Sequence, residues 1–268
     1  MSHLPLTKQE LYEQAPSLFT SEPHFKVSNK YHFIPTIEVV EKIQQHNWHP
    51  VSVQEASVRD LSKDGYQRHY VRFRHISDLL NPKENAIELL LFNSHDRTSA
   101  FSLSAGVYRF VCANGLVVAS NTIDSYKIKH LGNRANDVAE AINHISSYAP
   151  KLKRKIEDFS AIEMNENEKL AFAEAALPLR FEEQLYIEPS QLLTPHREAD
   201  EKDDLYTVFN VVQENLIRGS LKGHNRYSGR VFTSKPVKSI QKDVEINKGL
   251  WELTEYFAKI KEPIGFAA

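Results

Sequence analysis

The feature that most limits the fold of this chain is a change in apolar spacing near Gly132. Before this residue, short segments at 51–55, 67–76, 86–93 and 100–103 have the composition of strands, and in the first two apolar and polar residues alternate. This period of two is typical of strands, and the connections are too short for parallel crossovers. After Gly132, apolar residues recur every three or four positions, as in helices, at 138–159, 170–177, 205–216 and 246–260. The sequence therefore predicts an α+β fold, with an antiparallel sheet in the N-terminal half packed against a mostly helical C-terminal half.

The same change in spacing suggests a division of the chain into residues 1–132 and 133–268. A single two-layer domain satisfies the pattern equally well. Pro150 lies inside the long apolar seam at 138–159, where proline is expected to kink or split a helix. The segment 106–112 fits a helix or a strand, and Asn114-Gly115 predicts a tight turn.

Composition narrows the class of protein without naming a function. The 268 residues carry a formal net charge of −2, so the whole molecule is not a basic nucleic-acid coat. A single cysteine, Cys112, excludes an intrachain disulfide and fits a reducing compartment. The sequence shows no signal peptide and no apolar stretch of membrane-spanning length. We expect a soluble protein of the cytoplasm without a cofactor or a bound metal.

One segment, residues 215–242, contradicts the balanced overall charge. It contains no acidic residue, three of the nine glycines and seven cations. Because the glycines disfavour a helix, we expect a flexible basic loop between two helices. Such sets of cations neutralise nucleic-acid phosphates, and interleaved aromatics stack on unpaired bases. The predicted nucleic-acid contacts are Arg218, Lys222, Arg226, Tyr227, Arg230, Phe232, Lys235 and Lys238. The alternatives are a solvated loop and a loop that contacts another protein.

Two smaller basic clusters are also candidates for phosphate contact. Arg72 and Arg74 lie on the same face of the strand predicted at 67–76, together with Tyr70. They could extend the nucleic-acid surface, although the same pattern describes the solvent face of a half-buried sheet. The cluster at 151–155 holds four cations and is more typical of a solvated helix face.

His95-Asp96 is the pair that most resembles catalytic machinery, because a carboxylate can orient a histidine as a general base. No nucleophile accompanies the pair. An Asp side chain that closes a hairpin turn explains it more simply. His46 and His49 have no third ligand for a metal. Phosphate-binding glycine loops, zinc-protease motifs and nucleophile elbows are absent from the sequence.

Several sequence blocks resemble a family found in enterobacterial prophages and conjugative plasmids, the domain of unknown function 932. The resemblance covers about residues 28–260 and rests on the blocks at 31–36, 89–96, 106–117, 212–219 and 246–251. The matched polar positions include Asn93, His95, Asp96, Arg109, Asn114 and Arg218. We take the first five as a second candidate site, in which Arg109 could form a buried ion pair with Asp96.

The resemblance implies an accessory protein of a mobile element, from a family whose genes lie near anti-restriction genes, and supplies no catalytic residues. Our first hypothesis is therefore a non-catalytic protein that binds DNA. In its more specific version, the bound DNA is single-stranded. The alternative is an anti-defence protein that inhibits a host immunity factor, with residues 198–204 as an acidic contact surface. An enzyme is the least favoured hypothesis. The sequence leaves oligomerisation open.

Overall fold

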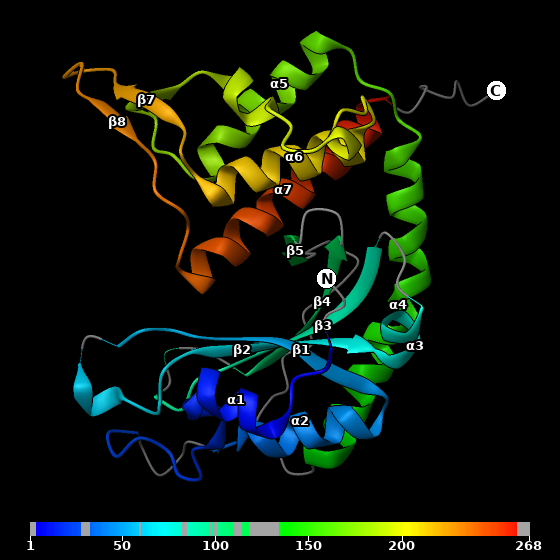
Figure 1. Cartoon of the computed structure of the whole chain (residues 1–268), viewed down its shortest axis with the longest axis vertical. Coiled ribbons are helices and arrows are strands. Elements are labelled where there is room, and N and C mark those ends of the chain that lie inside the picture. Colours follow the sequence, from blue (N-terminus) through cyan, green and yellow to red (C-terminus); the bar gives the residue numbers. More distant parts are fainter. Residues whose placement is uncertain are drawn as a thin grey trace. The chain divides into compact units, whose positions relative to one another are not determined.

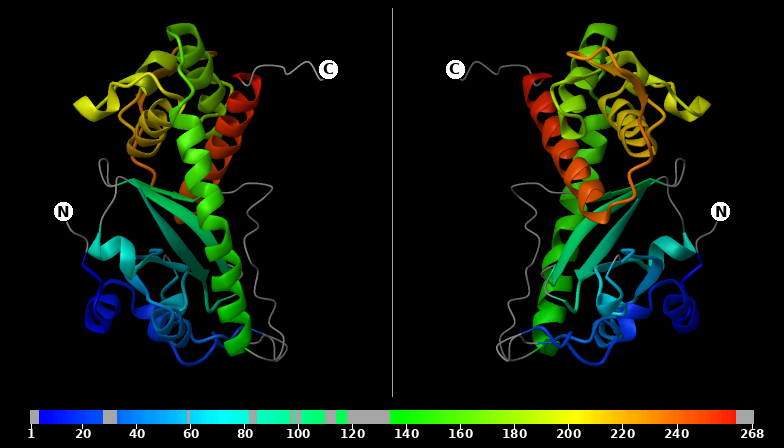
Figure 2. Two further views of the ribbon diagram at one scale, coloured as in Figure 1. Left: turned by 90° about the vertical axis from the view of Figure 1, so that its right-hand side faces the viewer. Right: turned by 90° about the vertical axis from the view of Figure 1, so that its left-hand side faces the viewer.

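The computed structural model describes residues 4–27, 33–58, 60–81, 85–96, 98, 101–109, 114–117 and 134–261. The chain divides into two compact units, Met1–Ala149 and Pro150–Ala268. The sequence suggested a division near Gly132, whereas this one falls at Pro150. That proline lies within a continuous helix, α4 (Arg134–Ser160), which contributes to both units (Figure 2).

The first unit is built on a five-stranded antiparallel sheet in the order β1-β2-β3-β4-β5 (Figure 1). The predicted antiparallel meander is confirmed. The strands are β1 (Trp48–Glu55), β2 (His69–His75), β3 (Asn85–Asn93), β4 (Ser102–Arg109) and β5 (Asn114–Val117). The ambiguous segment after Gly106 thus continues β4 as far as Arg109. Asn114-Gly115 does not form a turn, because both residues pair with the end of β4.

Three helices accompany this sheet, α1 (Lys8–Gln14), α2 (Thr36–Gln45) and α3 (Ile76–Leu80), with 3-10 turns at Pro16–Phe19 and Leu61–Lys63. Thr7 and Glu10 form a capping box that starts α1. Val40 and Ile43 of α2 are fully buried, as are Val71 and Leu91 of the sheet. The core of the unit therefore lies between these helices and one sheet face.

The second unit is mainly helical, with α5 (Glu166–Ala176), α6 (Leu205–Arg218) and α7 (Ile240–Lys261) beside the end of α4 (Figure 1). Trp251 of α7 is fully buried against Phe159 and Phe209. Asp204 caps α6 by accepting a 2.8 Å hydrogen bond from the Thr207 amide. Three 3-10 turns, at Leu177–Leu179, Pro189–Leu193 and Glu198–Asp200, connect these helices.

A second, small antiparallel sheet in this unit consists of β6 (Leu185–Ile187), β7 (Lys222–Asn225) and β8 (Val231–Thr233). It holds the segment for which the sequence predicts a flexible loop. β7 and β8 form a hairpin, residues 222–233, which we call the basic hairpin. The prediction of irregular structure was therefore wrong for these residues.

Candidate nucleic-acid interface

The basic hairpin is held in shape by its own turn. Asn225 accepts hydrogen bonds with its side-chain oxygen from the amides of Tyr227 (3.0 Å) and Ser228 (2.9 Å). Gly229 has a positive φ of 69°, a conformation that glycine adopts at little cost. Gly229, one of the three glycines that disfavour a helix, thus helps to close a tight, ordered turn.

Close packing anchors the base of the hairpin to the helices. The Arg180 guanidinium donates to the backbone carbonyls of Leu216 and Lys235, so it ties the end of α6 to the chain beyond β8. Gly219 ends α6 with a φ of 78°, and a Cβ there would lie 2.7 Å from the backbone of Lys235. Gly223 lies just as tightly against β6, where a Cβ would be 2.3 Å from the Tyr186 carbonyl oxygen.

The cations of the segment are exposed and mostly unpaired. Of the seven, only Arg218 forms an ion pair with a described residue, Glu214 at 3.5 Å. The other six form no ion pair with any residue that the structure describes. The exposed members of this group are Lys222, Arg226, Arg230, Lys235 and Lys238. Lys242, in the first turn of α7, is half-buried.

The two predicted aromatic contacts have different surroundings. Tyr227 lies at the tip of the hairpin with 86% of its surface exposed. Phe232 is half-buried, and its ring lies over Gly223, 2.9 Å from where a Cβ would be. Phe232 is therefore committed to packing between β7 and β8. Tyr227 is the aromatic side chain that is open to a ligand.

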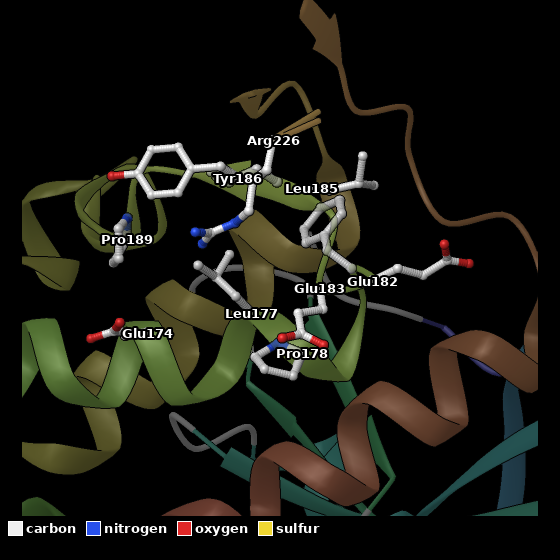
Figure 3. A pocket seen from close by; sticks show the side chains of 11 residues that line it. Glu174, Leu177, Pro178, Glu182, Glu183, Leu185, Tyr186, Pro189 and Arg226 are labelled. Atoms are coloured by element: carbon white, nitrogen blue, oxygen red, sulfur yellow. The ribbon is translucent and has the colours of Figure 1, made fainter. Parts of the chain in front are cut away.

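A pocket of about 420 Å³ opens beside β6, next to Arg226 in the turn of the hairpin (Figure 3). Apolar side chains form most of its wall, including Leu177, Phe181 and Leu185. Arg226 reaches over it from the hairpin, and its guanidinium carbon lies 5.1 Å from the centre of the Tyr186 ring. Glu174, Glu182 and Glu183 complete the lining.

Arg72 and Arg74 are not part of an exposed basic surface. Both guanidinium groups pair with Glu88 on the neighbouring strand β3, and Arg74 Nη2 lies 2.7 Å from Glu88 Oε1. Glu88 is fully buried, and the Arg74 side chain is 2% exposed. The sequence predicted a surface that could contact phosphate, whereas the structure places a buried ion network there.

The acidic segment 198–204 is also largely neutralised. Arg197 pairs with Asp200 at 2.8 Å and with Glu214 at 2.7 Å. Lys169 pairs with Asp203 at 2.7 Å, and Asp204 caps α6. In the basic cluster at 151–155, Lys155 pairs with Glu255, while Lys153 and Arg154 are exposed.

The five residues of the second predicted site lie in two separate parts of the sheet. Asn93 and His95 are buried where β3 ends, and Asp96 follows them. Arg109 pairs in register with Asn85, at the opposite end of β3, and Asn114 pairs with Arg109. Asp96 lies 3.2 Å from Lys63 instead. The expected ion pair between Arg109 and Asp96 is therefore wrong, because the two residues flank opposite ends of one strand.

Asp96 has the structural role that the sequence favoured. Its Oδ1 accepts hydrogen bonds from the backbone amide (3.0 Å) and the hydroxyl of Thr98. Burial is the largest single influence on the pKa of Asp96, and it raises that pKa. The hydrogen bonds from Thr98 and Lys63 together outweigh burial, so the pKa of Asp96 lies below its ordinary value. The carboxylate thus closes the turn after β3.

Around His95 the structure reveals a buried polar cluster of Ser17, Thr36, His69, Asn93 and His95. The Nδ1 atom of His69 lies 2.7 Å from the Ser17 hydroxyl, and its Nε2 lies 2.8 Å from the Thr36 hydroxyl. Asn93 donates to the same Thr36 oxygen at 2.9 Å. The Nδ1 atom of His95 has no hydrogen bond of ordinary geometry within the described chain.

Burial dominates the electrostatics of both histidines. It lowers the pKa of His69 to about 3, with a further contribution from His95. It also lowers the pKa of His95 to about 4, against the opposing effects of the Ser17 backbone and Asp96. Both rings are therefore neutral at pH 7. Because its five side chains are at most 2% exposed and both hydroxyls already contact His69, the cluster is better suited to holding α2 and the Pro16–Phe19 turn onto the sheet than to catalysis.

The grouping of Ser17, Thr36 and His69 in one cluster could not be predicted from the sequence. They come from a 3-10 turn, a helix and a strand, far apart in the chain. The one indication was that His69 shares a face of the predicted strand with the apolar residues Val71 and Phe73, which favours an inward-pointing His69.

Residues 23–251 match the family described as Domain of unknown function (DUF932). The chain belongs to this family. Two proteins of Escherichia coli (strain K12), UPF0380 protein YfjQ and UPF0380 protein YafZ, are each 32% identical to it over 252 residues. Each alignment covers 94% of this chain and 91% of the relative. No solved structure matches the chain.

The described part of this DUF932 chain shows neither a membrane span nor a cluster of metal-binding side chains. None of the described helices is long and apolar enough to span a membrane. The described residues include no group of three or more His, Cys, Asp or Glu side chains placed to hold a metal ion.

Proposed function

We propose that this protein binds single-stranded DNA through the basic hairpin, as an accessory protein of a mobile element. The observation that carries the proposal is the set of exposed cations, on and beside one ordered hairpin, that have no carboxylate partner among the described residues. Cations that lack an internal partner are available to replace the counterions of a phosphate backbone.

The exposed aromatic residue at the tip favours single strands over duplexes. Tyr227 lies between Arg226 and Arg230 in sequence and projects from the turn with little burial. An unpaired base can stack on such a ring, whereas the bases of a duplex are already stacked on each other. The hairpin thus offers phosphate contacts and a stacking surface at one place.

The test is a titration of a labelled single-stranded oligonucleotide at several salt concentrations. A variant in which Arg218, Lys222, Arg226 and Arg230 are all replaced by alanine is compared with the wild type. If the four cations contact phosphates, the logarithm of the wild-type affinity should fall with the logarithm of salt concentration with a slope of roughly −3. The variant should show a much flatter slope.

All four side chains are exposed, so the variant should keep its fold, which fluorescence of the buried Trp251 would verify. Absence of wild-type binding at low salt, or equal slopes for the two proteins, would reject the proposal. Our alternative, inhibition of a host immunity factor through residues 198–204, has less support because Arg197 and Lys169 neutralise much of that segment. Recovery of one host protein from nuclease-treated lysate would favour that alternative.

A further inference from the structure

We propose that the pocket beside β6, next to Arg226 in the turn of the basic hairpin, receives one unpaired nucleobase that carries an exocyclic amine. This inference rests on the proposed binding of single-stranded DNA and goes beyond it, because it gives the protein a preference among bases. The pocket and the hairpin share Arg226, so a strand held by the hairpin cations passes directly over the opening.

The walls of the pocket suit a flat aromatic ring. Phe181 and Tyr186 supply aromatic surface, and Leu177 and Leu185 supply aliphatic contacts. At about 420 Å³ the pocket lies within the size range of small-molecule sites. All four of these side chains are only partly buried, so they have surface left to cover a ligand.

The charges of the pocket are arranged for a nucleotide rather than for a purely apolar ligand. Figure 3 shows the Arg226 side chain extending across the opening beside Tyr186, with Glu174 and Glu183 at other parts of the rim. A guanidinium there can pair with the phosphate of the inserted nucleotide. The carboxylates can accept hydrogen bonds from an exocyclic amine, as Glu and Asp do from cytosine N4.

Two of the three carboxylates are available for this role. Glu182 already accepts a hydrogen bond from Gln184. Glu174 and Glu183 are exposed and form no hydrogen bond with another described side chain. Thymine has no exocyclic amine, and its one ring N–H on that edge lies between two carbonyl oxygens, which these carboxylates would repel. The pocket should therefore prefer cytosine or adenine to thymine.

The experiment compares the affinities of the full chain for four ligands of equal length at fixed low salt. These are oligo-dC, oligo-dT, an abasic deoxyribose-phosphate strand, and a duplex that contains the dC strand. We expect oligo-dC to bind about tenfold more tightly than oligo-dT. We expect the abasic strand and the duplex to bind more weakly than oligo-dC, because neither offers an unpaired base.

Two variants separate the pocket from the hairpin. Phe181→Ala should weaken oligo-dC binding at least fivefold and leave binding of the abasic strand unchanged. Phe25→Ala, which removes an exposed aromatic of the first unit, is the matched control and should change neither affinity. A double variant with Glu174→Gln and Glu183→Gln should lose the preference for dC over dT. It should also bind the abasic strand at least as tightly, since two negative charges are removed.

The outcomes distinguish this inference from the function on which it rests. If the abasic strand binds as tightly as oligo-dC, and Phe181→Ala has no effect, the pocket does not receive a base, although the hairpin still binds the backbone. If wild-type protein binds none of the four ligands at low salt, the proposed function fails and the base pocket fails with it.

Discussion

The imidazole rings of His69 and His95 lie with their centres 5.2 Å apart in the interior of the first unit. Both are at most 1% exposed, and the Thr36 hydroxyl lies 2.8 Å from His69 Nε2 and 3.5 Å from His95 Nε2. Two histidines this close and this well buried can coexist only while both are uncharged. The fold of this unit is therefore coupled to pH.

The first prediction concerns that coupling. In the folded state the pKa of His69 is about 3 and that of His95 about 4, below the value of 6.5 for an unperturbed histidine. Since both pKa values are lowered, the unfolded chain binds more protons than the folded one at pH below 6.5. The free energy of unfolding should be highest above pH 6.5. It should fall with each unit of acidification by up to about 1.4 kcal/mol per histidine.

Tryptophan fluorescence can measure this effect in the first unit alone. The chain has two tryptophans, Trp48 in the first unit and Trp251 in the second, so Trp251→Phe leaves one reporter. Urea unfolding of this background is compared at pH 7 and pH 5 with and without His95→Gln. The substitution should lower stability at pH 7 and reduce its pH dependence. His46→Gln, at an exposed histidine, is the control, and an unchanged pH dependence in His95→Gln would contradict the prediction.

The second prediction concerns Glu88, the shared partner of Arg72 and Arg74. Glu88→Gln removes the negative charge and leaves two guanidinium groups without their buried counterion. Loss of one partner from a buried ion pair costs about 3–5 kcal/mol of stability. Lys8→Ala, which breaks the exposed ion pair with Glu41, should cost less than about 1 kcal/mol. Similar values for the two variants, measured by urea unfolding with Trp48 as reporter, would show that Glu88 is not a structural counterion.

The third prediction tests the close approach of β6 and β7. Gly223→Ala would place a methyl group 2.3 Å from the Tyr186 carbonyl oxygen, so the two strands must separate. We expect a loss of about 1–3 kcal/mol in the stability of the second unit, together with weaker binding of DNA. Gly229→Asn is the matched control, because a Cβ there meets nothing within 4 Å and asparagine tolerates a positive φ. Trp251 fluorescence in a Trp48→Phe background reports the unfolding.

The part of the fold that depends on local periodicity could be predicted from the sequence. The alternation in β2, the apolar run of β3 and the apolar spacing of α6 predicted these elements, and the short connections between strands predicted their antiparallel order. The burial of Arg72 and Arg74 could have been found as well. The single acidic residue within the apolar run 86–92 is Glu88, and antiparallel pairing places it opposite Arg74.

Contacts between distant segments could not be predicted in this way. The basic segment forms a hairpin because β6, far upstream, pairs with β7, and the absence of a side chain at Gly223 makes room for that strand. Nothing in residues 215–242 alone reveals that neighbour. The same holds for the pocket, because Phe181 and Arg226 meet only through this sheet.

The last prediction separates the two kinds of contact that the basic hairpin offers to single-stranded DNA. Arg230→Ala removes one exposed cation, so the salt dependence of binding should become less steep by about 0.7 in the log–log slope. Tyr227→Ala removes a stacking surface and no charge. It should weaken binding by about 1–3 kcal/mol at every salt concentration and leave the slope unchanged. Tyr227→Phe keeps the ring and should bind as the wild type does. Equal affinities for wild type and Tyr227→Ala across the salt series would mean that the hairpin binds the phosphate backbone alone.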